Sequence, residues 1–224
     1  LWMEILNLGS HRIGVRFPEK GLRKGKNPAI LLNDGELIEQ LNLRTERTVL
    51  VGVYPNNRLS EYTPWPEPAI RPGTPDFGGQ LGQYHRELIN EILPALIDEY
   101  ALDTEKLAYG GYSLGGLAAA MSLWETDAFA AVFSLCGSFW YPGVADFIEE
   151  HIPKNYSAQV YLQNGIREGE GHNNRLCDAY SYAQRIHTAL QATCGAKTVL
   201  DDYGHHDRQS ERLNAALRWV ERVL

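Results

Sequence analysis

Cysteine is scarce in this sequence: among 224 residues there are three, Cys136, Cys177 and Cys194. Their number is odd and no short spacing links them, which argues against the disulfide framework of a small secreted domain. No Cys-x-x-Cys pair and no cluster of cysteine and histidine has the spacing of a zinc site. The sequence therefore predicts a reduced setting, a cytoplasmic location and no structural metal ion.

Long apolar runs and a surplus of positive charge are also missing. No window of about 20 apolar residues exists, which predicts that no helix spans a membrane. The first residues show no basic segment followed by an apolar one, so we expect no signal peptide within them. With 21 lysines and arginines against 28 acidic residues, the net charge is −7. Nucleic acids and anionic membranes bind basic surfaces, so neither is expected as a partner.

The chain does contain enough apolar material for a buried core. Apolar residues make up 44% and aromatic residues 10% of the sequence, which excludes disorder. Apolar runs rich in β-branched residues are continuous rather than alternating, which predicts strands of a parallel sheet covered on both faces. These runs are Ala29–Asn33, Thr48–Tyr54, Leu107–Tyr112, Ala130–Leu135, Gln159–Leu162 and Lys197–Asp201, and Arg12–Phe17 is predicted as an edge strand.

Amphipathic segments fill the intervals between these runs. The alternation predicts the α/β class: one domain over residues 1–224, with a mostly parallel, doubly wound sheet and helices on both faces. Residues Pro55–Gly78, which contain six prolines and no periodicity, are predicted to form a long loop, and such loops are often functional. Helices are predicted at 79–100, with a kink at Pro94, and at Leu114–Trp124, Asn174–Ala192 and Arg208–Leu224.

The run Gly110–Gly116 contains the pattern Gly-x-Ser-x-Gly, with Ser113 at its centre. Chance alone gives this pattern about one time in ten in a chain of this length. Here an apolar strand leads into it and an alanine-rich helix leads out, which is the context of a nucleophile elbow. Side chains in place of Gly111 and Gly115 would clash in the strained turn. Ser113 is therefore predicted to be the nucleophile of a serine hydrolase with an α/β-hydrolase-type sheet.

A serine hydroxyl needs a base, and the chain order in this fold is serine, then acid, then histidine. The pair His205-His206 follows the last predicted strand, where the base belongs. Other downstream histidines fit less well, because they lie near a helix end (His151), in a polar loop (His172) or within a helix (His187). Only one of the pair can point at the serine, and on this reasoning both remain candidates.

The acid is expected after the penultimate strand. Glu168 lies there, and its role would be to fix the histidine tautomer and to stabilise the imidazolium. Glu170 and Asp178 are rivals in the same region, whereas Asp201 and Asp202 lie too close to the histidines along one strand. For each carboxylate the alternative is a solvated surface charge.

An oxyanion hole needs two N–H donors. One is expected from the backbone of Leu114, next to the nucleophile, and the other from the loop after an early central strand. In that loop Gly35 or Glu36 would supply the donor, and Glu36 is preferred. The alternative is a plain strand-to-helix turn in which Asp34 caps a helix.

Several of these segments together resemble the putative esterase family, which includes enterobactin and other ferric-siderophore esterases, feruloyl esterases and esterase D-like serine hydrolases. The resemblance runs over nearly the whole chain and implies an α/β-hydrolase fold, with neither a metal ion nor an organic cofactor. The segments that carry it are Leu31–Gly35, Arg58–Pro64, Gly110–Gly116, Ser138–Trp140, Gly165–Glu168 and Gly204–Asp207.

The family pattern also bears on the base and the acid. Family members typically carry an arginine some six residues after the histidine, and Arg212 stands six residues after His206. The resemblance therefore favours His206 over His205, although the aromatic residue usual before that arginine is absent. Family members usually carry the acid directly after a Gly-x-x turn, which supports Glu168.

The substrate pocket is expected near the same motifs. Arg58 and Arg167 could bind an anionic group of the substrate, although a surface position is the commoner role for an arginine. Aromatic residues that could line the pocket, with core packing as the alternative, are Trp140 and Tyr62, and beside them Tyr141 and Trp65.

The leading interpretation is a serine esterase that hydrolyses a carboxylic ester of a small molecule through an acyl-enzyme on Ser113. A catalytically silent binding or scaffold protein on the same fold is one alternative, and an acyltransferase is the other. We expect the segment Pro55–Gly78 and the residues after Ser138 to set the specificity.

Overall fold

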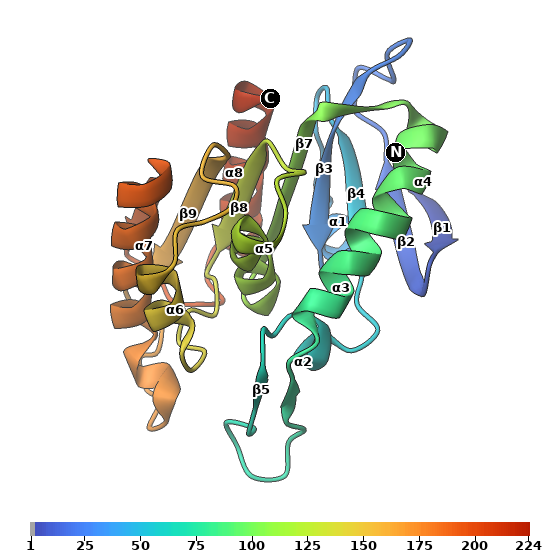
Figure 1. The fold of residues 1–224 in the computed structure, drawn as a ribbon. Helices are drawn as coiled ribbons and strands as arrows, with labels where there is room; N and C mark the ends of the chain where they lie inside the picture. Colours follow the sequence, from blue (N-terminus) through green and yellow to red (C-terminus); the bar gives the residue numbers. More distant parts are fainter. Residues whose placement is uncertain (1–2) are drawn as a thin grey trace.

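The computed structural model describes residues 3–224, and its centre is an eight-stranded sheet (Figure 1). The pairs β1–β2 and β2–β4 are antiparallel and the other five neighbouring pairs are parallel, which confirms the predicted α/β class. Leu1 and Trp2, which belong to the predicted domain, lie outside the described residues. Across the sheet the order is β1 (Glu4–Leu8), β2 (His11–Arg16), β4 (Val49–Tyr54), β3 (Asn27–Asn33), β7 (Leu102–Tyr112), β8 (Ala131–Leu135), β9 (Gln159–Gly165) and β10 (Lys197–Asp201).

The edge strand on the amino-terminal side is β1, so the prediction of an edge at Arg12–Phe17 is wrong. The chain turns after β1 at Gly9, whose φ of 56° is readily adopted only by glycine, and β2 then runs back along β1. In β1 half-buried and exposed residues alternate, so the strand carries no continuous apolar run that the sequence could reveal.

Side chains of the central strands point alternately into two helical layers. In β3, Leu31 packs into one layer, whereas Ile30 and Leu32 pack into the other. Because both faces are covered, each position of such a strand needs an apolar residue, which explains the continuous runs and confirms the doubly wound arrangement. One layer holds α3 (Leu81–Glu87), η1 (Leu88–Ile92), α4 (Leu93–Tyr100), α5 (Leu114–Glu125), α6 (Val144–Glu150) and α7 (Ala179–Cys194), and the other holds α1 (Leu37–Gln40) and α8 (Gln209–Val223).

Two predicted helices are interrupted. The segment 79–100 divides into α3, the π-helical η1 and α4. Pro94 lies in the first turn of α4, directly after the π-helical turn. The segment predicted at Asn174–Ala192 begins as a 3₁₀ turn, η2 (Arg175–Asp178), and continues as α7.

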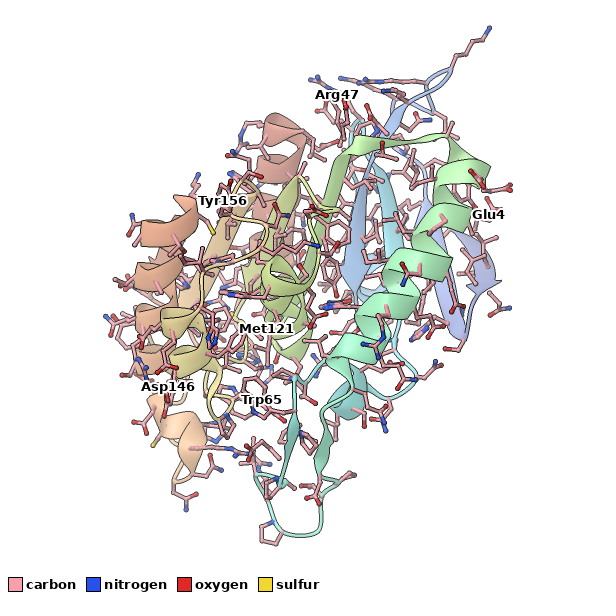
Figure 2. The ribbon with its side chains drawn as sticks, in the orientation of Figure 1. Glu4, Arg47, Trp65, Met121, Asp146 and Tyr156 are labelled. Atoms are coloured by element: carbon pink, nitrogen blue, oxygen red, sulfur yellow. The ribbon has the colours of Figure 1, made fainter. Side chains whose placement is uncertain are left out.

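The segment Pro55–Gly78, predicted as a loop, contains α2 (Arg58–Glu61) and a hairpin of β5 (Pro66–Glu67) and β6 (Phe77–Gly78) that extends away from the main sheet (Figure 1). Trp65 lies at the base of this hairpin (Figure 2). It donates its Nε1–H to the Pro142 carbonyl at 2.9 Å. The hairpin is thereby attached to the segment that precedes α6.

The parallel strands bring their carboxyl ends to one edge of the sheet, where ligands bind in open α/β folds. Ser113 directly follows β7, Cys136 directly follows β8, and Glu168 follows β9 within the next turn. Within residues 3–224, no helix is both long and apolar enough to cross a membrane.

Candidate active site

Ser113 lies in a sharp turn between β7 and α5. Its φ and ψ are 60° and −123°, a conformation that costs a residue other than glycine about 1–3 kcal/mol. The turn is held by bonds from the Ser113 N–H to the Leu135 carbonyl (2.9 Å) and from the Leu117 N–H to the Ser113 carbonyl (3.0 Å). A Cβ at Gly111 would lie 2.3 Å from the Gly115 carbonyl oxygen, so this approach requires glycine. The strained backbone presents the Ser113 hydroxyl at the carboxyl edge of the sheet.

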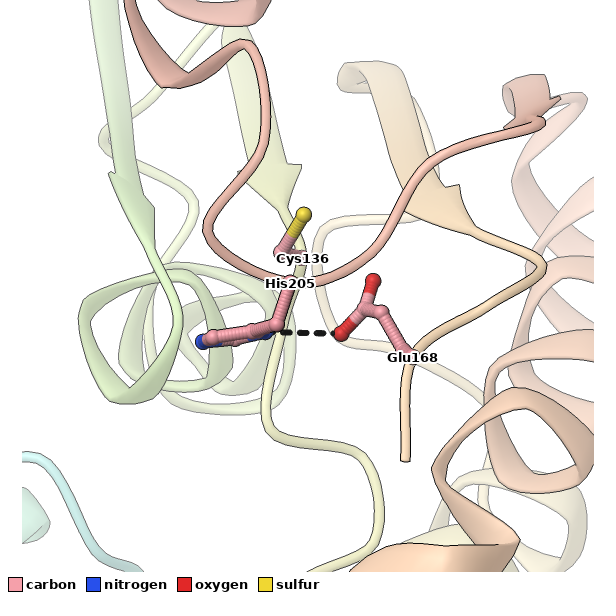
Figure 3. A group of neighbouring side chains, drawn as sticks. All are labelled: Cys136, Glu168 and His205. Carbon is pink, nitrogen blue, oxygen red and sulfur yellow. Dashed lines mark hydrogen bonds and ion pairs between the residues drawn. The ribbon is translucent and has the colours of Figure 1, made fainter. Parts of the chain in front are cut away.

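His205 bridges Ser113 and Glu168. Its Nε2 lies 2.9 Å from Ser113 Oγ, and its Nδ1 lies 2.8 Å from a carboxylate oxygen of Glu168. Figure 3 shows the second of these contacts. Since a carboxylate only accepts, Nδ1 carries the proton and Nε2 is left to accept the proton of the serine. The geometry is that of a nucleophile, a base and an acid that orients the base.

The choice of His206 as the residue that faces Ser113 is corrected to His205. The His206 side chain is exposed, and its ring stands at 87° to that of His205 with the centroids 4.9 Å apart. The spacing to Arg212 misled the prediction because Arg208 adopts a left-handed conformation (φ 52°) before α8 begins. The turn therefore takes up one residue more than the family pattern implies.

Glu168 is 6% exposed and accepts two further hydrogen bonds, from the Gly165 N–H at 2.8 Å and from the Asn164 side-chain amide at 3.1 Å. Burial alone would raise the pKa of Glu168. The hydrogen bond and charge of His205, together with the Gly165 N–H and the Cys136 thiol, lower that pKa below its ordinary value. The carboxylate is thus kept ionised beside His205 at neutral pH.

The rival acids occupy other surroundings. Glu170 pairs with Arg167 at 3.0 Å on the surface, and Asp178 is exposed. Asp201 is paired with the buried guanidinium of Arg212. Among the acids considered, the structure brings Glu168 to the ring of the candidate base.

The candidate oxyanion hole lies beside Ser113. Leu114 is the first residue of α5, so its N–H has no partner inside the helix. The prediction that Gly35 could be the second donor is corrected, because its N–H already donates to the Val53 carbonyl at 3.0 Å. No other residue within 3–224 accepts from the Glu36 N–H. Burial raises the pKa of the Glu36 carboxyl, and the hydrogen bond from its own N–H opposes that effect without cancelling it.

Two cavities meet at Ser113. The larger is about 510 Å³ and lies on the Glu168 side, and the smaller is about 280 Å³ and lies on the Glu36 side. Apolar walls of the larger cavity come from Trp140 and from residues of the hairpin and η2, namely Ile70 and Leu176. Trp140 therefore lines the cavity beside Ser113.

The assignment of Tyr62 to the substrate pocket is corrected. Its side chain is completely buried, and its hydroxyl accepts a hydrogen bond from the Asp34 N–H at 2.9 Å. Tyr141 is also buried and donates its hydroxyl to the Trp65 carbonyl at 2.6 Å. These aromatic side chains are packing residues that support the loops around the site.

Both arginines considered as anion ligands line a cavity, but each already has a carboxylate partner. Arg58 lines the smaller cavity and donates Nε–H and Nη2–H to Asp34 at 2.8 and 3.1 Å. Arg167 lines the larger cavity and is the partner of Glu170. Asp34 also does not cap α1 with its side chain, because that side chain is taken by Arg58.

The sequence profile of a protein family described as "Putative esterase" matches residues 9–219. The chain belongs to the Putative esterase family. This confirms the family resemblance, and with it an activity on esters in the general sense. A relative from Bacillus subtilis (strain 168), Uncharacterized protein YbbA, is 28% identical over 83% of this chain and 82% of that protein.

Solved structures agree with this membership at the level of the fold. An IroE-like serine hydrolase from Shewanella oneidensis superimposes with a TM-score of 0.75 at 18% identity, over 99% of this chain and 79% of that chain. The enterobactin esterase FES from Shigella flexneri, in the presence of enterobactin, gives 0.74 at 16% identity, over 99% and 58%. The predicted α/β-hydrolase fold is therefore confirmed.

Three residues beside Ser113, His205 and Glu168 of this Putative esterase family member were not singled out for this place in the sequence. Asn164 donates to Glu168, and Tyr112 donates its hydroxyl to the His205 carbonyl at 2.5 Å. Cys136 directly follows β8 and has a φ of 46°, unusual for a residue with a side chain. The sequence does contain one signal for such a residue, namely a polar side chain at the carboxyl end of an apolar strand, and Asn164 has this position.

Cys136, Glu168 and His205 are also the one group within residues 3–224 whose donor atoms, all within 4.8 Å of one another, have the spacing of metal ligands (Figure 3). A cation fits them poorly. Arg212 already donates Nη1–H to Cys136 Sγ at 2.9 Å and brings a positive charge. Burial raises the pKa of the Cys136 thiol, whereas a metal needs the thiolate. The group therefore belongs to the hydrogen-bonded surroundings of His205.

Proposed function

We propose that this member of the Putative esterase family hydrolyses carboxylic esters with Ser113, His205 and Glu168 as a catalytic triad. The observation that carries the proposal is the continuous hydrogen-bonded path from Glu168 through His205 to Ser113 Oγ, with contacts of 2.8 and 2.9 Å. Such a path activates a hydroxyl that is a weak nucleophile by itself. The family membership supports the same activity.

In the proposed reaction Ser113 Oγ attacks the ester carbonyl carbon while its proton passes to His205 Nε2. The carbonyl oxygen becomes an oxyanion, which the N–H groups of Leu114 and Glu36 stabilise. The tetrahedral intermediate then releases the alcohol, which takes the proton from His205, and the acyl group stays on Ser113. Water then attacks the acyl-enzyme and gives a proton to His205, and when the carboxylic acid leaves, His205 returns this proton to Ser113 Oγ.

The Glu36 carboxyl adds one requirement to this reaction. It shares a hydrogen bond with its own N–H, so it has to give up that contact when the oxyanion forms.

We propose an ester of a small molecule as the substrate. The larger cavity of about 510 Å³ offers an apolar wall that includes Trp140 to one part of the ester, and the smaller cavity of about 280 Å³ receives the other part. The structural relative described as an enterobactin esterase supports a small-molecule ester as well.

The test is the replacement Ser113→Ala, assayed on a short p-nitrophenyl ester and by labelling with a fluorophosphonate probe. We expect hydrolysis to fall about 10⁴-fold and labelling to disappear, because the acyl-enzyme needs the Ser113 oxygen. The matched control is Ser138→Ala, which removes a hydroxyl 3.4 Å from Ser113 Oγ.

Ser138→Ala should keep the label, and peptide mapping should find it on Ser113. Hydrolysis by Ser113→Ala within tenfold of the wild type would overturn the mechanism. Absence of both labelling and hydrolysis in the wild-type protein would instead favour a binding or scaffold protein on this fold.

A further inference from the structure

Arg212, on α8, is the largest of the fully buried side chains. Its Nε–H and Nη2–H form a two-point ion pair with Asp201, at 2.9 and 2.5 Å. Burying a charged group is costly unless it is paired and hydrogen-bonded, so a guanidinium at this place needs an explanation beyond packing. Asp201 supplies the opposite charge, and it leaves the third nitrogen, Nη1, for other partners.

Nη1 of Arg212 points into the turn that carries the candidate base. It donates to the Gly204 carbonyl at 3.0 Å and lies 3.5 Å from the His205 carbonyl. The same nitrogen contacts the Tyr112 hydroxyl at 2.9 Å. One guanidinium thus joins the end of β10, the end of β7 and the histidine turn.

Tyr112 holds the same carbonyl from the other side. Its hydroxyl donates to the His205 carbonyl at 2.5 Å, and its ring packs edge-on to the His205 ring at 5.8 Å. Tyr112 directly precedes Ser113. Ser113 and His205 are therefore connected through the Tyr112 hydroxyl as well as through the contact between their own side chains. The backbone of His205 is therefore fixed relative to the backbone of Ser113.

On the outer side of this turn the Asp207 side chain accepts a hydrogen bond from the Gly204 N–H at 2.9 Å, whereas the partners of the His205 carbonyl lie on the inner side. The side chains of His206, Asp207 and Arg208 are exposed, and Gly204 has no side chain at all. The bonds from Arg212 and Tyr112 come from beneath the turn, where the protein is buried. Without them the main chain at His205 would keep the bonds between Gly204 and Asp207 and the ring contacts of His205 to Ser113 and Glu168.

We infer that Arg212 is a positioning residue that holds the main chain of His205 at the distance required for proton transfer from Ser113. The inference rests on the proposed triad and adds a role for a residue that does not touch the reacting atoms. Asp201 balances the charge of Arg212, so the effect is geometric rather than a field acting on the imidazole. A displacement of about 1 Å in such a pair costs about 100-fold in rate.

The experiment is Arg212→Lys in the full chain. Lysine keeps the charge but replaces a planar fork by a single ammonium, which cannot reach Asp201, Tyr112 and the Gly204 carbonyl together. We expect kcat to fall about 30-fold with KM within about threefold of the wild type. The low-field proton resonance of His205 Nδ1–H, hydrogen-bonded to Glu168, should broaden or vanish in the folded variant.

The matched control is Arg16→Lys. Arg16 is also buried and donates Nη1–H to the Leu43 carbonyl at 2.8 Å. It pairs with Leu50 near the start of β4, at the end of the sheet opposite the candidate site. Arg16→Lys should lower the melting temperature yet keep kcat and the low-field resonance, because it disturbs a buried guanidinium without touching the histidine turn.

The inference is overturned if folded Arg212→Lys retains kcat within threefold of the wild type together with an unchanged low-field resonance. Should Arg212→Lys not fold, Asp201→Asn decides, since it weakens the two-point ion pair that orients Nη1 of Arg212 toward the histidine turn and leaves the Tyr112 hydroxyl in place. A kcat lowered about fivefold or more supports the inference that Arg212 holds the His205 main chain in position, and an unchanged kcat overturns it. If Ser113→Ala were fully active, the proposed triad itself would fail, which is a separate result.

Discussion

The imidazole of His205 stands edge-on to that of its neighbour His206, with the centroids 4.9 Å apart and the planes at 87°. Adjacent residues thus present two rings of the same chemistry, of which one reaches Ser113 Oγ. We predict that His205→Ala lowers kcat about 10⁴-fold, because the serine loses its proton acceptor. His206→Ala should keep kcat within about tenfold, since that ring lies at the mouth of the cavities.

Each of these two variants is the matched control for the other, because both remove a histidine side chain from the same turn. Steady-state hydrolysis of a p-nitrophenyl ester and the rate of fluorophosphonate labelling measure the effect. The reverse order of the two activities would return the role of base to His206.

Glu168 should affect both activity and acid stability. Its folded pKa is lowered, so the unfolded chain takes up its proton first as the pH falls. The stabilisation by this carboxylate is complete above its unfolded pKa of about 4.5 and is lost as the pH falls below that value through the folded pKa. We predict that Glu168→Gln flattens the pH dependence of the free energy of unfolding below about pH 4.5 and lowers kcat about 100-fold or more at pH 7.

Glu170→Gln is the control for Glu168→Gln, because Glu170 is an exposed carboxylate two residues away that pairs with Arg167. Glu170 lines the larger cavity but does not contact His205, so its replacement should lower kcat far less than Glu168→Gln does. Urea unfolding at several pH values gives the slope of the free energy of unfolding against pH. Equal slopes for the wild type and Glu168→Gln would show that the partners of the Glu168 carboxylate in the folded protein do not stabilise its ionised form.

Gly111 and Gly82 should respond in opposite ways to alanine. A Cβ at Gly111 would lie 2.3 Å from the main-chain oxygen of Gly115, which cannot move without disturbing the Ser113 turn. At Gly82, on α3, the nearest atom is the end of the flexible Arg86 side chain at 3.5 Å. We predict that Gly111→Ala costs about 3 kcal/mol or more and abolishes labelling, whereas Gly82→Ala stabilises by about 0.5 kcal/mol.

Thermal unfolding and the fluorophosphonate probe measure both variants under the same conditions. A stable, fully labelled Gly111→Ala would mean that the turn relaxes around a methyl group. In that case the glycine would not be needed to present Ser113.

Local rules explain which parts of the site could be predicted. The run around Ser113 is a strand, a turn and a helix that are consecutive in the chain, and the structure has β7, a strained turn and α5 there. Glu168, predicted from its place after a neighbouring parallel strand, does follow β9 and contacts His205. Continuous apolar runs such as Ala29–Asn33 predicted β3 because both faces of the sheet are covered.

The predictions that failed concern residues whose positions depend on contacts between segments that are distant in the sequence. The choice between His205 and His206 required the left-handed conformation of Arg208, which an arginine adopts only under tertiary constraint. Tyr62 is an aromatic residue of the kind that often lines a pocket. Its burial follows from its packing against the loop of Asp34, which the sequence does not show. The role of Arg212 likewise needed three partners from separate strands and turns.

His187 provides a test of the buried surroundings of Glu168. It is buried on α7, and its Nε2–H donates to the Asn164 side chain at 2.9 Å, which in turn donates to Glu168 at 3.1 Å. Burial lowers the pKa of His187 to about 4, and the charge of Glu168 opposes this shift only in part. The folded protein therefore holds this imidazole neutral in a pH range where the unfolded chain protonates it.

The stabilisation that follows is lost as the pH falls from about 6.5 to about 4, a range that lies above the window of Glu168. The difference between the two pKa values corresponds to about 3 kcal/mol at its full extent. His187→Gln keeps an N–H donor for Asn164 and does not titrate, so its free energy of unfolding should change less over this range. His151→Gln removes an exposed histidine and should follow the wild type, as measured by urea unfolding between pH 7 and pH 4. If His187→Gln and the wild type lose stability in parallel, His187 takes up its proton over the same pH range in the folded protein as in the unfolded chain.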